Sequence, residues 1–308
     1  MRIGLVTDSL GHLDRDSMLD AASSMGIEAL EIGCGAWSSA PHLDLDATLA
    51  SDTERLSLLA AIERRGMELV ALNCSGNPLH PGHSGAAHRR VAEKTIRLAP
   101  LLGVKRVVMM SGCPGGPGDA NANWITTAWP PETAEVLAWQ WRERIVPFWQ
   151  DLAALAAANG VTLALELHGQ QAVYNVPTLF RLRDAVGKRV GANLDPSHLM
   201  WMGADPARAA TALGPAIHHV HAKDTRIDPA NAALASVIDT TPMADHPHRA
   251  WSYVTLGDGH PLPWWRTFLA ALRAAGYDDV LSIEHEDVSC TPEEGVARSV
   301  ELLREAMV

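Results

Sequence analysis

The strongest constraint in this sequence is a regular alternation of short apolar runs with longer segments of helical periodicity. The runs are rich in Val, Ile and Leu, as buried parallel strands are, and the longer segments repeat apolar residues every three or four positions. Eight pairs of strand and helix can be counted. Strands are predicted over 3–7, 29–32, 68–73, 106–110, 162–167, 190–194, 217–222 and 280–284. Helices are predicted over 17–25, 52–65, 88–102, 132–159, 177–186, 205–213, 263–275 and 292–307.

Eight repeated units predict an α/β fold, a closed (β/α)8 TIM barrel formed by a single domain over residues 1–308. With 308 residues, of which 47% are hydrophobic, the chain can bury the core of one such barrel. An open, doubly wound sheet is the alternative. No GxGxxG motif follows the first predicted strand, and eight units favour closure.

Composition excludes several classes of partner. The formal net charge is -11 with only 25 basic residues, and no basic stripe is present, so a nucleic-acid partner is not expected. No apolar stretch reaches membrane-spanning length, and no signal-like segment opens the chain. The four cysteines are scattered without CxxC spacing, which fits free thiols in a reducing compartment. A soluble, cytoplasmic protein is expected.

Four acidic or imidazole residues stand at the ends of the last four predicted barrel strands: Glu166, Asp195, His221 and Glu284. The carboxyl ends of barrel strands converge on one rim, so these side chains are expected to lie together. Three carboxylates and one imidazole form a mixed oxygen and nitrogen set, which suits Mn²⁺, Mg²⁺ or Co²⁺. The pattern therefore predicts one divalent metal site.

The segments around these residues resemble known motifs. They are Leu163-Ala-Leu-Glu-Leu-His168, Asn193-Leu-Asp-Pro-Ser-His198, His219-Val-His-Ala-Lys-Asp224 and Gly276-Tyr-Asp-Asp-Val-Leu-Ser-Ile-Glu-His-Glu-Asp287. In these motifs, and over essentially its whole length, the chain resembles the sugar phosphate isomerase/epimerase superfamily. These xylose isomerase-like barrels include ketose 3-epimerases and inosose dehydratases. The resemblance assigns Glu166, Asp195, His221 and Glu284 as ligands of one ion, with Mn²⁺ as the expected metal.

The resemblance also implies a reaction. These enzymes abstract a proton beside a carbonyl, and a divalent ion acting as a Lewis acid stabilises the resulting enediolate. Glu166 and Glu284 are then the first candidates for base and acid on opposite faces of a keto-sugar. An isomerase or epimerase is the simplest reading. A lyase of the same chemistry, either an inosose dehydratase or a subunit that eliminates a substituent from a 3-keto glycoside, is the alternative.

Several neighbouring residues are candidates for contact with substrate. His168 lies two residues beyond Glu166, so on an extended strand it points to the same side, as a general base or as a donor to a strand-end carbonyl. His198 has the Asp-x-x-His spacing of the epimerases and is expected to bind a substrate hydroxyl or orient a ligand. Lys223 shares the parity of His221 and is expected either to touch substrate or to pair with Asp224 or Glu286. Arg226 matches a substrate-binding arginine of the epimerases, although the spacing is shorter here.

Three long predicted loops, 73–87, 111–131 and 223–262, are rich in Gly, Pro, His and Trp, and barrels place substrate specificity in such loops. Asn73 lies in the first of these loops and Trp124 in the second, and both are expected to contact substrate. The indole of Trp124 would offer an apolar face and an N–H to a sugar. The glycine-rich run 112–118 lacks the Lys-Ser/Thr ending of a phosphate-binding loop, which favours a neutral sugar.

Two contrasting functions are kept open. An endonuclease IV-like enzyme would need further histidines on the early strands, and the acidic charge opposes DNA. The second contrasting function is that of a non-catalytic barrel that only binds sugar. Homo-oligomerisation, or pairing with a second subunit, is expected because barrels of this kind commonly associate.

Overall fold

A computed structural model describes residues 1–308, and its eight parallel strands close into a barrel in the order β1-β10-β7-β6-β5-β4-β3-β2. The predicted TIM barrel is therefore confirmed. The strands are β1 (Arg2–Val6), β2 (Ala29–Gly33), β3 (Glu68–Asn73), β4 (Arg106–Met110), β5 (Thr162–Glu166), β6 (Val190–Leu194), β7 (Ile217–Ala222) and β10 (Val280–Ile283).

The helices follow the predicted alternation with additions. They are η1 (Thr7–Leu10), α1 (Arg15–Met25), α2 (Leu45–Ala50), α3 (Asp52–Glu63), α4 (His83–Leu101), α5 (Pro131–Trp139), η2 (Gln140–Ile145), α6 (Val146–Ala158), α7 (Val176–Val186), α8 (Pro196–Trp201), α9 (Pro206–Leu213), η3 (Gly214–Ala216), α10 (Pro229–Ala235), η4 (Met243–His248), α11 (Leu262–Ala274) and α12 (Pro292–Met307). The single helix predicted over 132–159 is continuous from 131 to 158, and the six residues of η2 within it, between α5 and α6, are π-helical. No helix has both the length and the apolar character needed to cross a membrane.

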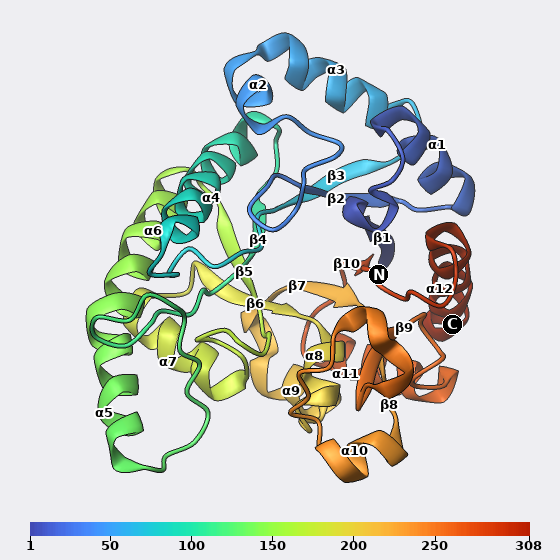
Figure 1. Cartoon of the computed structure of the whole chain (residues 1–308). Coiled ribbons are helices and arrows are strands. Elements are labelled where there is room, and N and C mark those ends of the chain that lie inside the picture. Colours follow the sequence, from blue (N-terminus) through green and yellow to red (C-terminus); the bar gives the residue numbers. More distant parts are fainter. The chain divides into compact units, whose positions relative to one another are not determined.

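The chain forms two compact units, and the first comprises Met1–Glu31, Ala61–Glu68 and Leu194–Val308. In it β1 pairs with β10 (Ile3 opposite Leu281) and with β2 (Val6 opposite Glu31), and β10 pairs with β7 (Ser282 opposite His221). Helix α12 packs against α1 and α11 (Figure 1). These pairings put the ends of β7 and β10 side by side.

The second unit comprises Ile32–Ala60 and Leu69–Asn193. In it β3, β4, β5 and β6 pair in sequence, with Met110 opposite Glu166 and Glu166 opposite Asn193. Helix α4 packs against α2 and α6, and α6 packs against α7, as Figure 1 shows. The organisation of the chain as one domain remains a prediction.

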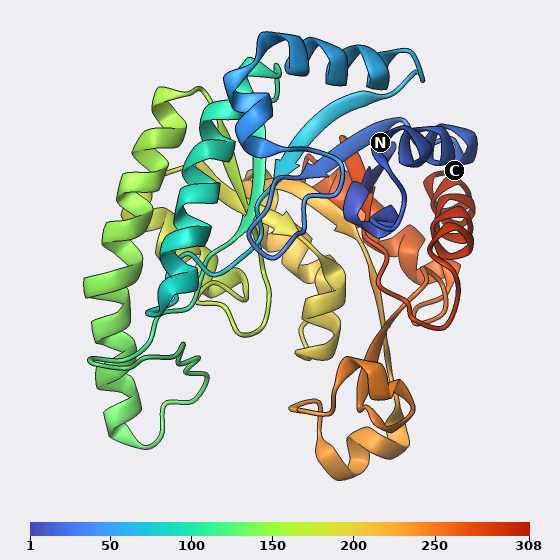
Figure 2. The ribbon, with the colours of Figure 1, turned by 45° about the horizontal axis from the view of Figure 1, so that its top comes forward.

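The segment expected as a long loop over 223–262 contains regular structure. Strands β8 (Asp224–Ile227) and β9 (Trp251–Val254) form an antiparallel pair, with Asp224 opposite Val254, and Figure 2 shows the pair leading out to α10. The indole of Trp251 stacks on Trp201 of α8 at 4.8 Å between ring centroids. Each strand has only four residues, too few for alternation to distinguish it from a loop.

Candidate functional site

Three side chains of the first unit meet where β6, β7 and β10 end. Asp195 directly follows β6 and caps α8, with its Oδ1 accepting a hydrogen bond from the Ser197 amide at 2.8 Å. His221 lies on β7, and Glu284 directly follows β10. His221 Nδ1 lies 3.0 Å from Glu284 Oε2 and 4.0 Å from Asp195 Oδ2. One ligand atom of each residue lies within 4.8 Å of the others, so the three can share one ion.

The donor set fits a divalent cation. Asp195 is fully buried, and its Oδ2 lies 3.2 Å from His198 Nε2 and 4.0 Å from His221 Nδ1. Burying a carboxylate is costly, and a cation beside it offsets that cost. Two carboxylates and an imidazole are donors that Mn²⁺, Mg²⁺ and Zn²⁺ accept. The geometry of this unit therefore supports three of the four predicted ligands.

Electrostatics in this cluster favour a positive charge. Burial alone would lower the pKa of His221, but the carboxylates of Glu31 and Glu284 raise it well above its usual range. Burial would raise the pKa of Glu284, yet Lys223 and His221 hold it at about 2. Glu284 is therefore a carboxylate at neutral pH. The imidazole of His221 lies between carboxylates, which stabilise either a proton on its ring or a metal ion bound beside it.

Glu31 of β2 is a site residue that sequence reasoning missed. Its carboxylate is fully buried and lies 2.7 Å from His219 Nε2 and 3.1 Å from His221 Nε2. Ser282 Oγ lies 3.0 Å from the same His219 nitrogen. The signal was a lone carboxylate in the middle of the apolar run 29–33. A buried charge in a central strand implies a specific partner.

His198 and Lys223 complete this group. The Tyr253 hydroxyl lies 3.0 Å from His198 Nδ1, and the Lys223 ammonium lies 4.2 Å from the centroid of the Tyr253 ring. Lys223 Nζ lies 2.9 Å from Glu286 Oε2 and 3.3 Å from Glu284 Oε2, so the expected pairing with Glu286 is confirmed.

The alternative pairing of Lys223 with Asp224 does not form. Asp224 instead accepts hydrogen bonds from the amides of Gly257, Gly259 and His260 and contacts the His260 ring at 2.7 Å. Side chains alternate along an extended chain, so Asp224 faces away from its neighbour and organises the turn after β9.

In the second unit, Glu166 is the last residue of β5 and is buried, with Asn193 Nδ2 3.5 Å from its Oε2. The strand ends one residue before the predicted Leu167, because the His168 amide donates to the Glu166 carbonyl and the chain turns. A ring nitrogen of His168 still lies within 4.8 Å of a Glu166 carboxylate oxygen. His168 Nδ1 also contacts the Gly169 carbonyl, the structural role expected for it.

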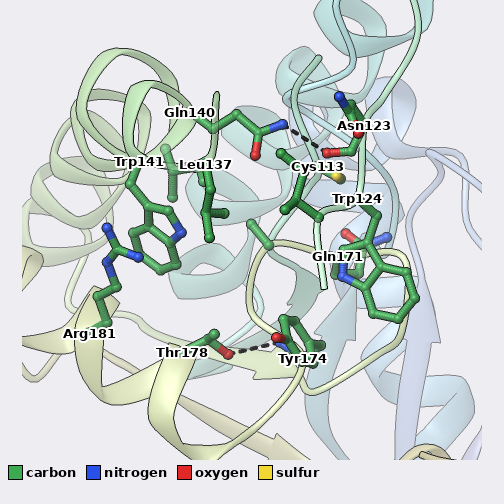
Figure 3. Close-up of a pocket in the computed structure, with 13 residues that line it drawn as sticks. Cys113, Asn123, Trp124, Leu137, Gln140, Trp141, Gln171, Tyr174, Thr178 and Arg181 are labelled. Carbon is green, nitrogen blue, oxygen red and sulfur yellow. Dashed lines mark hydrogen bonds between the residues drawn. The ribbon is translucent and has the colours of Figure 1, made fainter. Parts of the chain in front are cut away.

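The other predicted contacts lie at separate places. Asn73 ends β3, and its Oδ1 accepts a hydrogen bond from the Ser75 amide at 2.8 Å. Arg226 is exposed on β8 opposite Ser252. Trp124 lines a cavity of the second unit, edge-on to Tyr174 at 5.4 Å between ring centroids (Figure 3). Their contacts with substrate remain predictions.

Comparison with known proteins gives one family. Residues 19–306 match the sequence model of the xylose isomerase-like TIM barrel. The uncharacterized protein YfiH of Bacillus subtilis (strain 168) is 50% identical over 311 residues, which cover 100% of this chain and 99% of YfiH. The rhizopine catabolism protein MocC of Rhizobium meliloti is 37% identical over 83 residues, covering 27% of this chain and 26% of MocC.

Solved structures show the same fold at lower identity. A D-tagatose 3-epimerase-like protein superposes with a TM-score of 0.67 at 20% identity, covering 100% of this chain and 97% of the other. The IOLI protein, with a bound zinc atom, gives a TM-score of 0.67 at 19% identity over 99% and 98% of the two chains. The probable 3-DHS dehydratase AsbF from Bacillus anthracis gives 0.66 at 17% identity over 99% of each. Likeness at these identities supports the fold alone.

Proposed function

Since this chain belongs to the family of xylose isomerase-like TIM barrels, we propose that it is a divalent-metal-dependent enzyme that isomerises or epimerises a keto-sugar. The observation that carries the proposal is the cluster of the buried Asp195 and His221 with the half-buried Glu284, whose ligand atoms lie within 4.8 Å of one another. The carboxylates of Asp195 and Glu284 face the same nitrogen of His221, at 4.0 and 3.0 Å, so a cation between them would balance their charge.

Glu166 is proposed as the fourth ligand. It is the last residue of β5, so its place on its strand matches that of Glu284, which follows β10. The β5–β6 register sets Glu166 opposite Asn193, two residues before Asp195 in the chain. The zinc atom bound in the IOLI structure supports a metal ion in a barrel of this fold. Mn²⁺ is the proposed ion, because three carboxylates and one imidazole form a hard donor set.

The chemistry follows from the charge states of these residues. When bound, the ion would act as a Lewis acid that lowers the cost of deprotonating carbon beside a carbonyl. Glu284 is ionised at neutral pH because Lys223 and His221 stabilise its carboxylate, so it is in the state that a general base needs. Glu166 is proposed as the second proton-transfer group, with His168 next to it. His198 is fully buried, with Nδ1 against the Tyr253 hydroxyl and Nε2 3.2 Å from Asp195 Oδ2, so it is proposed to orient the Asp195 carboxylate and not to bind a substrate hydroxyl.

Solvent deuterium exchange tests the proposal. The protein is stripped of metal, reloaded with Mn²⁺ and incubated in D₂O with D-fructose and, separately, with a 3-keto glucoside. We expect deuterium to appear beside the carbonyl of one of them with the wild-type protein. Asp195→Asn and Glu284→Gln should lose both exchange and bound Mn²⁺, which metal analysis measures. Release of the glycosidic substituent would indicate elimination in place of epimerisation.

Glu301→Gln is the matched control, because Glu301 is an exposed residue of α12. It should leave metal content and exchange unchanged. A wild-type protein that takes up no divalent ion, or exchange that persists undiminished in Asp195→Asn without metal, would overturn the proposal. Mn²⁺ uptake without exchange into either sugar would leave a sugar-binding barrel as the better description.

A further inference from the structure

We propose that a cavity in the second unit is a binding site for a ring bearing one hydroxyl group, a phenol in chemical class. The cavity lies between the loop after β4, the π-helix η2 and the loop after β5. Figure 3 shows Trp124 and Trp141 on opposite sides of it, with Tyr174 at one end and Gln140 at the other. The space open to the centre of a water-sized sphere is about 50 Å³, more than the roughly 15 Å³ that one water needs on the same measure.

The walls are apolar and aromatic, and none of the lining residues is an Asp or a Glu. The Cys113 thiol is neutral, because burial raises its pKa to about 11. A site for a polyhydroxylated sugar would need several polar groups directed at the ligand. This lining therefore favours a single aromatic ring, which gains from contact with the faces and edges of indole and phenol rings.

Two polar side chains of the lining are already satisfied within the protein. Gln140 Nε2 donates to the carbonyls of Pro114 at 3.1 Å and Asn123 at 2.8 Å, which ties the loop after β4 to η2. Thr178 Oγ1 accepts from the Tyr174 amide and belongs to the capping box of α7. These groups shape the cavity and are not available to a ligand.

Two buried polar atoms of the lining have no hydrogen-bond partner: the indole Nε1 of Trp124 and the side-chain Oε1 of Gln171. Gln171 is only 1% exposed, so its oxygen carries the cost of an unsatisfied buried acceptor. One atom donates and the other accepts. A hydroxyl group matches this pair, because its oxygen accepts from the indole N–H while its hydrogen is donated to the glutamine oxygen.

The π-helix supports a binding role for this cavity. Its three buried side chains, Gln140, Trp141 and Ile145, all line the cavity. Short π-helical segments inside α-helices are rare and are frequently found at functional sites. Arg181 of α7 lies over the Trp141 ring at 4.1 Å and is exposed, so it marks the open side. The hydroxyl edge of the ring would lie toward Trp124 and Gln171, and the rest would lie toward Arg181 (Figure 3).

Binding of phenol to the whole metal-free protein tests this site. Tryptophan fluorescence and ligand-observed NMR would give the affinities of phenol and of toluene, which has the ring without the hydroxyl. We expect phenol to bind at least about tenfold more tightly, as expected for a ligand that satisfies two buried polar atoms. Gln171→Leu and Trp124→Phe should each abolish most of this preference while retaining toluene binding. Trp264→Phe, in α11 of the other unit, is the control.

Each outcome decides the matter. The proposal is overturned if neither compound binds, if both bind equally well, or if Gln171→Leu and Trp124→Phe keep the preference. Circular dichroism would establish that the variants fold. If one does not, the position of phenol in a crystal of the wild-type protein replaces the variant. If the phenol proposal fails, the results for metal content and deuterium exchange still stand, because the cavity residues do not belong to the proposed set of metal ligands.

Discussion

His221 Nε2 lies 3.1 Å from both carboxylate oxygens of Glu31. Glu31 is ionised, because its two histidine partners hold its pKa well below the usual range although burial alone would raise it. Both ring nitrogens of His221 face carboxylates, so both carry a proton in the metal-free protein, and Glu31 would retain the proton on Nε2 when an ion replaces the one on Nδ1. The ring is thereby oriented with Nδ1 toward Glu284, at 3.0 Å, and Asp195, at 4.0 Å. Glu31 thus fixes the tautomer that presents Nδ1 to a metal.

Glu31→Gln is predicted to weaken Mn²⁺ binding. An amide accepts a weaker hydrogen bond from the imidazole and no longer increases its basicity, and loss of such a partner commonly lowers metal affinity about 10–100-fold. Titration calorimetry on metal-free protein would measure the change. Glu63→Gln, at an exposed position of α3, should bind Mn²⁺ as the wild type does. An unchanged affinity in folded Glu31→Gln would exclude the positioning role.

Lys223→Met is predicted to destabilise the metal-free protein and to increase its stabilisation by Mn²⁺. Removing this buried ammonium leaves Glu284 with less compensation, at a cost of about 3 kcal/mol. The cluster becomes more negative, so a divalent ion should bind more tightly and raise Tm by a larger increment. Calorimetric scans with and without Mn²⁺ would measure both effects. An increment equal to that of the wild type would mean that Lys223 does not affect the metal site.

Much of the barrel could be predicted because its signal is local. The bounds of β3, β4, β6 and β7 coincide with the predicted ranges, since each is a short segment with apolar residues that follows the end of a helix. Helix α4 begins at His83, five residues before the predicted 88, because the polar residues of its first turn carry no apolar period. The β8–β9 pair could not be predicted, because it joins residues about thirty positions apart.

The candidate site was predictable only in part, for a similar reason. Asp195, His221 and Glu284 stand at strand ends, where the repeat itself marks them. Glu31 lies in mid-strand as a lone carboxylate in an apolar run, which indicates a buried partner, but that partner, His219, is 188 residues away in the chain and the sequence does not identify it. Gln171 and Trp124 are ordinary loop residues in the sequence. Their unsatisfied polar atoms become visible only when the cavity is formed.

Asp287→Asn is predicted to remove a pH-dependent contribution to stability. Burial would raise the pKa of Asp287, but hydrogen bonds from Ser289 and Thr255 lower it to about 2. A carboxylate with a depressed pKa stabilises the folded state above its unfolded pKa of about 4, and the contribution is lost as the pH falls toward 2. Urea denaturation at pH 7 should show the variant less stable by about 2 kcal/mol. The difference from the wild type should shrink between pH 4 and pH 2, and a constant difference would contradict this origin.

Thiol labelling is predicted to single out one cysteine in the folded protein. Cys34, Cys74 and Cys113 are buried, whereas Cys290 is partly exposed and lies 3.4 Å from Thr255 Oγ1. Burial also raises the pKa of Cys74 to about 12, so hardly any of the reactive thiolate forms there. A disulfide reagent should therefore modify one thiol rapidly in the native protein and all four in urea. Cys290→Ser should abolish the fast phase, and Cys34→Ser should preserve it. A second fast thiol in the native wild type would show that a buried cysteine becomes accessible through local opening.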